Sequence, residues 1–338
     1  MSLISILKKK YNKTLFTTPS HNGNVKLFHK FYGWYGFDIS ETDTYNPQYA
    51  LESAEKRASE IYGTKYTKFL TNGSTSGILA AILASGGKHI AIWDNAHRCH
   101  KNGCLLAGAD IFEYKIQKDE TLGLYKAITT EEVKNIIKNN IDTIIITSPT
   151  YEGFAAEVKN ISEVCHKFGV KLIVDEAHGA LYPFSENLPT SAVKYADYTV
   201  QSLHKTAGGI NPTALLHSND INPAEALSKI NTTSPSYPML ATIEKNINFL
   251  NSKKGKRYIK ELINNIKDLN LPQYNDDITK IILMKDGLTG YELSDILFNK
   301  YNIEDERTNE KSTMLLCGIG TTKKMLKKLK KASDNLGL

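Results

Sequence analysis

VKLIVDEAHG (residues 170–179) and DYTVQSLHKTAGG (residues 197–209) carry the pattern that decides the fold. Each begins with a short apolar run and ends in polar or glycine-rich residues, which is typical of a buried strand that leads into a turn. Similar runs, separated mostly by helical patterns, lie at residues 65–74, 88–94, 109–115, 141–150 and 211–217. Because strands alternate with helices, we expect an α/β protein whose central sheet is mostly parallel and covered by helices.

The pattern changes after about Asn251, where long lysine-rich helices with weaker strands follow. We therefore predict a large domain over residues 1–250, including an N-terminal arm, and a smaller C-terminal α+β domain over residues 251–338. The 338 residues are 41% hydrophobic, enough to bury a large core. The lysine-rich stretch at residues 323–331 has apolar residues at helical spacing, which predicts an amphipathic terminal helix with a solvated basic face.

Composition excludes several classes of function. A net charge of +6, scattered along the chain, gives no reason to expect a nucleic-acid partner. The four cysteines form no C-x-x-C pair, so we expect no metal site and reduced thiols. No apolar run approaches the ~18 residues of a membrane span, and the N-terminal lysines follow the apolar residues, unlike a secretory signal. These features predict a cytoplasmic protein without a membrane partner.

Two residues at predicted strand ends carry the chemistry. Parallel strands place the ligand crevice beyond their carboxyl ends. Lys205 follows one strand, where desolvation would lower its pKa and free the amine to attack an aldehyde. Asp175 ends another, where its carboxylate suits the pyridine nitrogen of pyridoxal 5′-phosphate (PLP). A lysine that caps a loop, or an aspartate of a nucleotide or metal site, would fit either residue alone.

Two further segments fit the same cofactor. TNGSTSG (residues 71–77) opens a predicted helix with the hydroxyls of Ser74, Thr75 and Ser76, which suits a phosphate group but also an ordinary helix cap. His97 follows the strand at residues 88–94, where its ring could stack on the cofactor or serve only the structure. The order of phosphate cup, stacking ring, aspartate and lysine along the chain predicts a PLP site.

These motifs, with SPTYEG (residues 148–153), TTSPSYPML (232–240) and EDERTNEKSTMLLCGIG (304–320), resemble the major domain of the Orn/Lys/Arg decarboxylases, which have fold type I of the PLP enzymes. The resemblance implies that Lys205 forms the Schiff base, that Asp175 pairs with the pyridine nitrogen and that His97 stacks on the ring. It places Ala177 and His178 beside the ring. It implies phosphate-side contacts for Ser74, Thr75, Ser202 and His204. Thr232, Thr233 or Ser234 would reach the phosphate of a neighbouring subunit, which implies a homodimer with shared active sites.

The resemblance therefore implies a PLP-dependent decarboxylase of arginine, lysine or ornithine, without the family's C-terminal domain. Glu306, which matches a glutamate of the family, lies in an acidic cluster with Glu304, Asp305 and Glu310 that could receive the basic end of the substrate or form a solvated loop. The N-terminal motif of the family reads TPSHN here, at residues 18–22. An aminotransferase or lyase on the same scaffold is an alternative. Such enzymes usually carry an arginine for the substrate carboxylate, and Arg307, beside acidic residues, is the only arginine after Arg257. A PLP-binding protein without turnover of its own is the third possibility.

Overall fold

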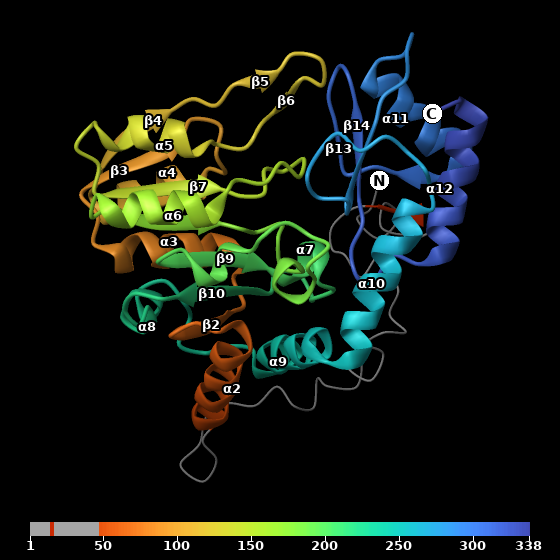
Figure 1. The fold of residues 1–338 in the computed structure, drawn as a ribbon. Coiled ribbons are helices and arrows are strands. Elements are labelled where there is room, and N and C mark those ends of the chain that lie inside the picture. Colours follow the sequence, from red (N-terminus) through yellow and green to blue (C-terminus); the bar gives the residue numbers. More distant parts are fainter. Residues whose placement is uncertain (1–13, 17–46) are drawn as a thin grey trace, which may run out of the picture.

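A seven-stranded sheet forms the centre of the larger part of the molecule (Figure 1). The computed structural model describes residues 14–16 and 47–338. The strand order is β2-β10-β9-β8-β7-β3-β4, with β10 antiparallel to β2 and β9 and the other neighbours parallel. The strands are β2 (Tyr66–Leu70), β3 (His89–Trp93), β4 (Asp110–Tyr114), β7 (Thr143–Thr147), β8 (Lys171–Asp175), β9 (Tyr198–Ser202) and β10 (Ala214–Ser218). The predicted, mostly parallel sheet is confirmed.

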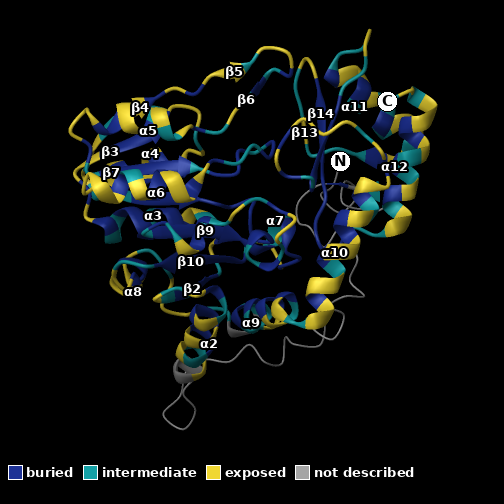
Figure 2. Ribbon diagram, in the orientation of Figure 1, coloured by how far each residue is buried: buried dark blue, intermediate teal, exposed yellow. Residues whose placement is uncertain are grey.

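Helices cover both faces of this sheet, so its strands are buried while the outer helix faces are exposed (Figure 2). Strand β7 shows why its sequence is a continuous apolar run. Ile144 and Ile146 pack into the core beneath α5 and α6, whereas Ile145 packs into the core beneath α3 and α4. The helices of this part are α2 (Pro47–Tyr62), α3 (Gly73–Ser85), α4 (Cys99–Ala107), α5 (Thr130–Ile137), α6 (Val158–Lys167), α7 (Leu203–Thr206), α8 (Ala224–Ser228) and α9 (Tyr237–Asn251).

A smaller part follows helix α10 (Lys253–Lys267) (Figure 1). Its antiparallel sheet has the order β11-β14-β13, and Phe16 lies in its core. The remaining elements here are β11 (Lys280–Leu283), α11 (Gly290–Tyr301), β12 (Ile303–Glu304), β13 (Arg307–Thr308), β14 (Thr313–Leu316) and α12 (Lys323–Leu336). Strand β1 (Thr14–Leu15) pairs in parallel with β12, so this piece of the predicted N-terminal arm packs against the smaller part. The division at residue 250, at the end of α9, stays a prediction.

A hairpin of the larger part contacts the smaller sheet. It consists of β5 (Lys118–Asp119) and β6 (Leu124–Tyr125), and Leu122 and Leu124 share an apolar cluster with Ile282 and Met314. The lysine-rich C-terminal stretch forms α12, which buries Leu326 and Leu329, as predicted. Within residues 14–16 and 47–338, no helix has the length and apolar character needed to cross a bilayer.

Candidate active site

A cavity of about 500 Å³ lies at the carboxyl ends of the central strands, and Arg307 of β13 also lines it. In Figure 1 this end of the sheet faces β13. Loops after β2, β3, β7, β8 and β9 contribute its walls, because the parallel strands of this sheet all end at this edge. The predicted site residues on the wall are Ser74, Thr75, His97, Asp175, Ala177, His178, His204 and Lys205. Asp175 and Lys205 therefore open into one cavity.

Lys205 lies in the short helix α7, directly after β9. Its Nζ is 3.1 Å from Nε2 of His178. Burial lowers the pKa of Lys205, and the negative charge of Asp175 opposes this shift. Burial and the charge of Lys205 also lower the pKa of His178 well below its usual value, so this imidazole is neutral and its Nε2 can accept a hydrogen bond from the amine.

Asp175 is held by a residue that the sequence did not single out. Nε2 of His100, in α4, is 2.9 Å from Oδ2 of Asp175, and the backbone N–H of Ala177 donates to Oδ1 at 3.1 Å. Burial alone would raise the pKa of Asp175, but His100 and Lys205 outweigh it, so the pKa lies below its usual value. The carboxylate is thus ionised and oriented. A second histidine three residues after His97 was the only sequence signal for this pair.

The start of α3 opens into the cavity. Asn72, Gly73, Ser74 and Thr75 all line the wall, and the side chain of Asn72, the N-cap residue, makes no capping hydrogen bond. Free N–H groups and the positive end of the helix dipole favour an anion here. Gly73 has a φ of +75°, a conformation that favours glycine. This end of the cavity therefore suits a phosphate group.

Other wall residues also fit a flat polar cofactor. His97 lies on the wall, and its Nδ1 accepts a hydrogen bond from the backbone N–H of Cys99. Three atoms of other wall residues are buried without a hydrogen-bond partner among the described residues: Trp93 Nε1, Thr147 Oγ1 and His178 Nδ1. Buried polar atoms usually have a partner, so these three are consistent with contacts to a bound molecule.

Cys99, His100 and Asp175 also offer possible metal-ligand atoms within 4.8 Å of one another. Burial and the charge of Asp175 raise the pKa of the Cys99 thiol, which keeps this thiol protonated. His100 Nε2 is already directed at the carboxylate. We therefore interpret the three residues as support for Asp175 rather than as a metal site.

The loop between β7 and β8 and residue Arg307 of β13 complete the wall. The Tyr151 hydroxyl donates to Glu306 Oε1 at 2.5 Å, and the Tyr151 ring lies 4.5 Å from the ring of His178. Arg307 lies on the cavity wall, with its guanidinium carbon 4.8 Å from the centre of the Tyr151 ring. Its Nη1 is 3.3 Å from Oε1 of Glu152. Tyr151 and Glu152 lie in the SPTYEG motif, but their contacts with Glu306 and Arg307 join residues more than 150 positions apart, which sequence spacing does not predict.

Some predicted residues are not among those that line the cavity. The Ser76 hydroxyl donates to the Gly73 carbonyl at 2.9 Å, and Ser202 is buried beside the wall. Thr232 and Thr233 are exposed, away from the cavity of their own chain. Glu306 is not among the lining residues, and its Oε1 accepts a hydrogen bond from the Tyr151 hydroxyl. Ser234 is likewise exposed. The motif at residues 18–22 lies outside the described residues.

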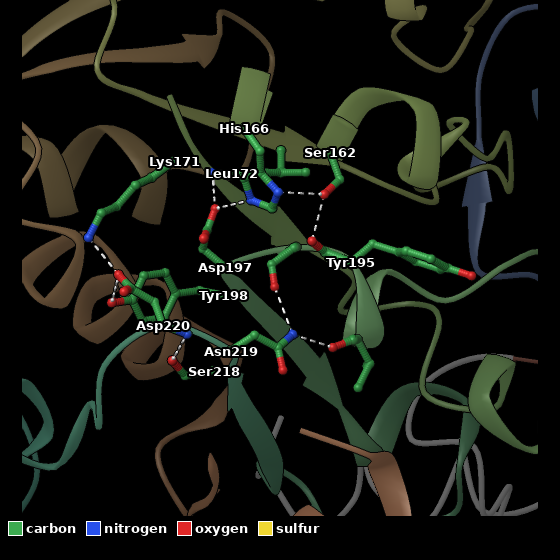
Figure 3. Close-up of polar contacts among 12 residues, drawn as sticks. Ser162, His166, Lys171, Leu172, Tyr195, Asp197, Tyr198, Ser218, Asn219 and Asp220 are labelled. Carbon is green, nitrogen blue, oxygen red and sulfur yellow. Dashed lines mark hydrogen bonds and ion pairs between the residues drawn. The ribbon is translucent and has the colours of Figure 1, made fainter. Parts of the chain in front are cut away.

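A second polar cluster lies at the opposite edge of the sheet (Figure 3). It contains Ser162, His166 and Asp197, the residue types of a hydrolytic triad. However, the Ser162 hydroxyl donates to the Tyr195 carbonyl at 2.6 Å, and Asp197 accepts the backbone N–H of Leu172 at 2.8 Å. A serine whose proton is held by a carbonyl is not activated by the histidine. This cluster ties α6 to the sheet and does not form a second active site.

Comparison with known proteins identifies the family of this chain. The family model of the Orn/Lys/Arg decarboxylase major domain matches residues 4–281. The chain belongs to this family. Arginine decarboxylase from Bacillus cereus is 27% identical over 352 residues, which cover 93% of this chain and 76% of that protein. Arginine decarboxylase from Bacillus subtilis is 30% identical to this chain. The match covers 78% of this chain and 60% of that protein.

Solved structures confirm fold type I. Lysine decarboxylase LdcF from Francisella novicida superposes with a TM-score of 0.73 at 17% identity over 99% of this chain. This chain covers 62% of LdcF, so it spans less than two thirds of that family member. Alanine–glyoxylate aminotransferase from Nostoc sp. has the same fold, with a TM-score of 0.65 at 13% identity over 90% of this chain and 91% of the other.

Proposed function

We propose that this chain is a PLP-dependent decarboxylase of a basic amino acid, arginine, lysine or ornithine, with Lys205 as the cofactor-bearing residue. The observation that carries the proposal is the single cavity into which Lys205, Asp175 and the start of α3 all open. The chain belongs to the Orn/Lys/Arg decarboxylase family, and the resemblance to this family implies PLP as the cofactor. Other described residues on the wall fit the same cofactor.

In this proposal the N–H groups at the start of α3, with Ser74 and Thr75, would hold the phosphate. His97 would lie against the ring, and Asp175 would serve the pyridine nitrogen. Bound PLP supplies an electron sink for the carbon that loses the carboxylate. The pair of Asp175 and His100 keeps a negative charge at the base of the cavity, which favours a proton on that nitrogen.

Lys205 would supply the reacting amine, and the residues around it would orient this amine and the substrate. The lowered pKa of Lys205 favours the unprotonated amine, which is the nucleophilic form. His178 is neutral and its Nε2 lies 3.1 Å from the Lys205 amine, so it can accept a hydrogen bond from the amine and orient it. Tyr151 packs against His178 and holds this ring in place. Glu306, which the sequence offers as one candidate for the basic end of the substrate, accepts a hydrogen bond from the Tyr151 hydroxyl.

We further propose a homodimer. The exposed segment at Thr232 and Thr233 would reach the phosphate of a second subunit, since it does not line the cavity of its own chain. Analytical ultracentrifugation with and without PLP tests this assembly. If the protein is a monomer and binds PLP as tightly at low as at high protein concentration, the shared site is contradicted.

Another reaction on the same scaffold is a second candidate, because Arg307 lies on the cavity wall. A decarboxylase yields carbon dioxide and an amine, whereas an aminotransferase or lyase yields a keto acid or ammonia. PLP reconstitution followed by an amino-acid panel with mass-spectrometric product analysis separates them. If the protein binds PLP but forms no product from any amino acid, it is a PLP-binding protein without turnover of its own.

Borohydride trapping tests the cofactor-bearing residue directly. After reduction, peptide mapping should find the cofactor on Lys205, and Lys205→Ala should trap none. Lys101→Ala, which removes an exposed lysine paired with Glu113, is the matched control and should trap normally. Trapping on another lysine in the unchanged protein would refute the proposed role of Lys205.

A further inference from the structure

Arg307 occupies a site on the cavity wall that is built for a cation. Its guanidinium lies over the face of Tyr151, 4.8 Å from the ring centre, and 3.3 Å from a carboxylate oxygen of Glu152. An aromatic face attracts a cation electrostatically, and a planar guanidinium also stacks on such a face. All three residues line the same cavity as Lys205.

Glu152 is buried, whereas its partner Arg307 is half-exposed. The Glu152 side chain is 7% exposed, whereas the Arg307 side chain is 50% exposed. Burial raises the pKa of Glu152, and the charge of Arg307 opposes this shift. A buried carboxylate needs a cation, but a half-exposed arginine can leave for solvent at little cost if another cation replaces it. The site therefore requires a guanidinium-like partner more than it requires Arg307 itself.

We infer that Tyr151 and Glu152 form a guanidinium site, which Arg307 fills in the free protein and the guanidinium of an arginine-like substrate takes over on binding. The inference rests on the proposed function and narrows its substrate class. It favours arginine over lysine or ornithine, because an ammonium is more strongly hydrated and does not stack as a plane. Arg307 then acts as an internal competitor that lowers the apparent affinity for substrate.

Butylguanidine is the probe, because it has no amine that could react with PLP and no carboxylate that Arg307 could bind. Butylurea has nearly the same shape without the charge. Isothermal titration of the PLP-reconstituted protein should show binding of butylguanidine and much weaker binding of butylurea. Arg307→Met should bind butylguanidine about tenfold more tightly, since the competitor is gone. Glu152→Gln should bind it at least about tenfold more weakly, since the buried charge is gone.

Arg57→Met is the matched control, because Arg57 forms an exposed pair with Glu244 at 2.7 Å outside the cavity. It should leave butylguanidine binding unchanged. Equal or weaker binding by Arg307→Met would overturn the inference. So would loss of binding in Glu306→Gln with normal binding in Glu152→Gln, since Glu306 would then hold the guanidinium. If Glu152→Gln does not fold, the comparison of Arg307→Met with the unchanged protein still decides.

The test is separable from the proposed function. Tighter butylguanidine binding by Arg307→Met without any carbon dioxide release from the amino-acid panel would keep the guanidinium site and reject the decarboxylase. Carbon dioxide release with unaltered butylguanidine binding in both variants would keep the decarboxylase and reject the site.

Discussion

Replacing His100 with leucine should weaken both the fold and the cofactor site. His100 Nε2 is 2.9 Å from Asp175 Oδ2, and both side chains are buried. A hydrogen bond to a charged group contributes about 1.5–3 kcal/mol, and removal of one partner leaves the other buried and unsatisfied. We therefore expect His100→Leu to lower the free energy of unfolding by about 2 kcal/mol. The affinity for PLP should fall about tenfold or more, because 1.4 kcal/mol corresponds to a factor of ten.

The effect should depend on pH in a defined direction. The pKa of Asp175 is lowered in the fold, so its contribution to stability is present above its ordinary pKa and is lost as the pH falls through the folded value. Urea unfolding of the cofactor-free protein at neutral and acidic pH measures this difference. The loss of unfolding free energy caused by His100→Leu should be largest at neutral pH and should become smaller in acid.

His166→Leu is the matched control. His166 forms a similar pair with Asp197 at 3.1 Å, but the histidine is half-exposed, and exposed pairs contribute less than about 1 kcal/mol (Figure 3). His100→Gln, which keeps a donor, should recover part of the loss. If His100→Leu and His166→Leu unfold at the same urea concentration and bind PLP equally, the supporting role of His100 is wrong.

Three further predictions concern stability. Burial raises the pKa of Glu176 to about 7, so the free energy of unfolding should fall by about 3 kcal/mol as the pH rises from about 4.5 through 7, and Glu176→Gln should remove this slope in urea unfolding measured across pH. Gly153→Ala should cost about 1–3 kcal/mol, because φ is +94° and a Cβ atom would lie 2.9 Å from Lys280 Cδ; Gly169→Ala, with a similar strain but open space, should cost less in the same assay. Lys280→Met should cost about 3–5 kcal/mol in thermal or urea unfolding, because it leaves the buried Asp277 carboxylate without its cation, and an unchanged midpoint would contradict this account.

The sequence by itself determined the sheet and the edge at which the site lies. Apolar runs that end in polar turns are local patterns, and parallel strands bring their carboxyl ends to one edge. The positions of the strands in the sequence therefore predicted that Lys205, Asp175 and His97 lie close together, and all three line one cavity. The orientation of individual side chains was less predictable. Ser76 lies only one residue beyond Thr75, but in a helix one residue turns the side chain by about 100°, away from the wall.

Only the tertiary structure decided which distant residues support and complete the site. The contact of His100 with Asp175, the pairing of β1 with β12 and the group of Tyr151, Glu152 and Arg307 join segments far apart in the chain. Periodicity and spacing describe neighbours along a strand or a helix turn and contain no information on such pairs. The group of Tyr151, Glu152 and Arg307 follows from how the smaller part packs against the edge of the large sheet. His100 meets Asp175 within the larger part, and β1 meets β12 of the smaller part, so these contacts too are properties of the folded chain.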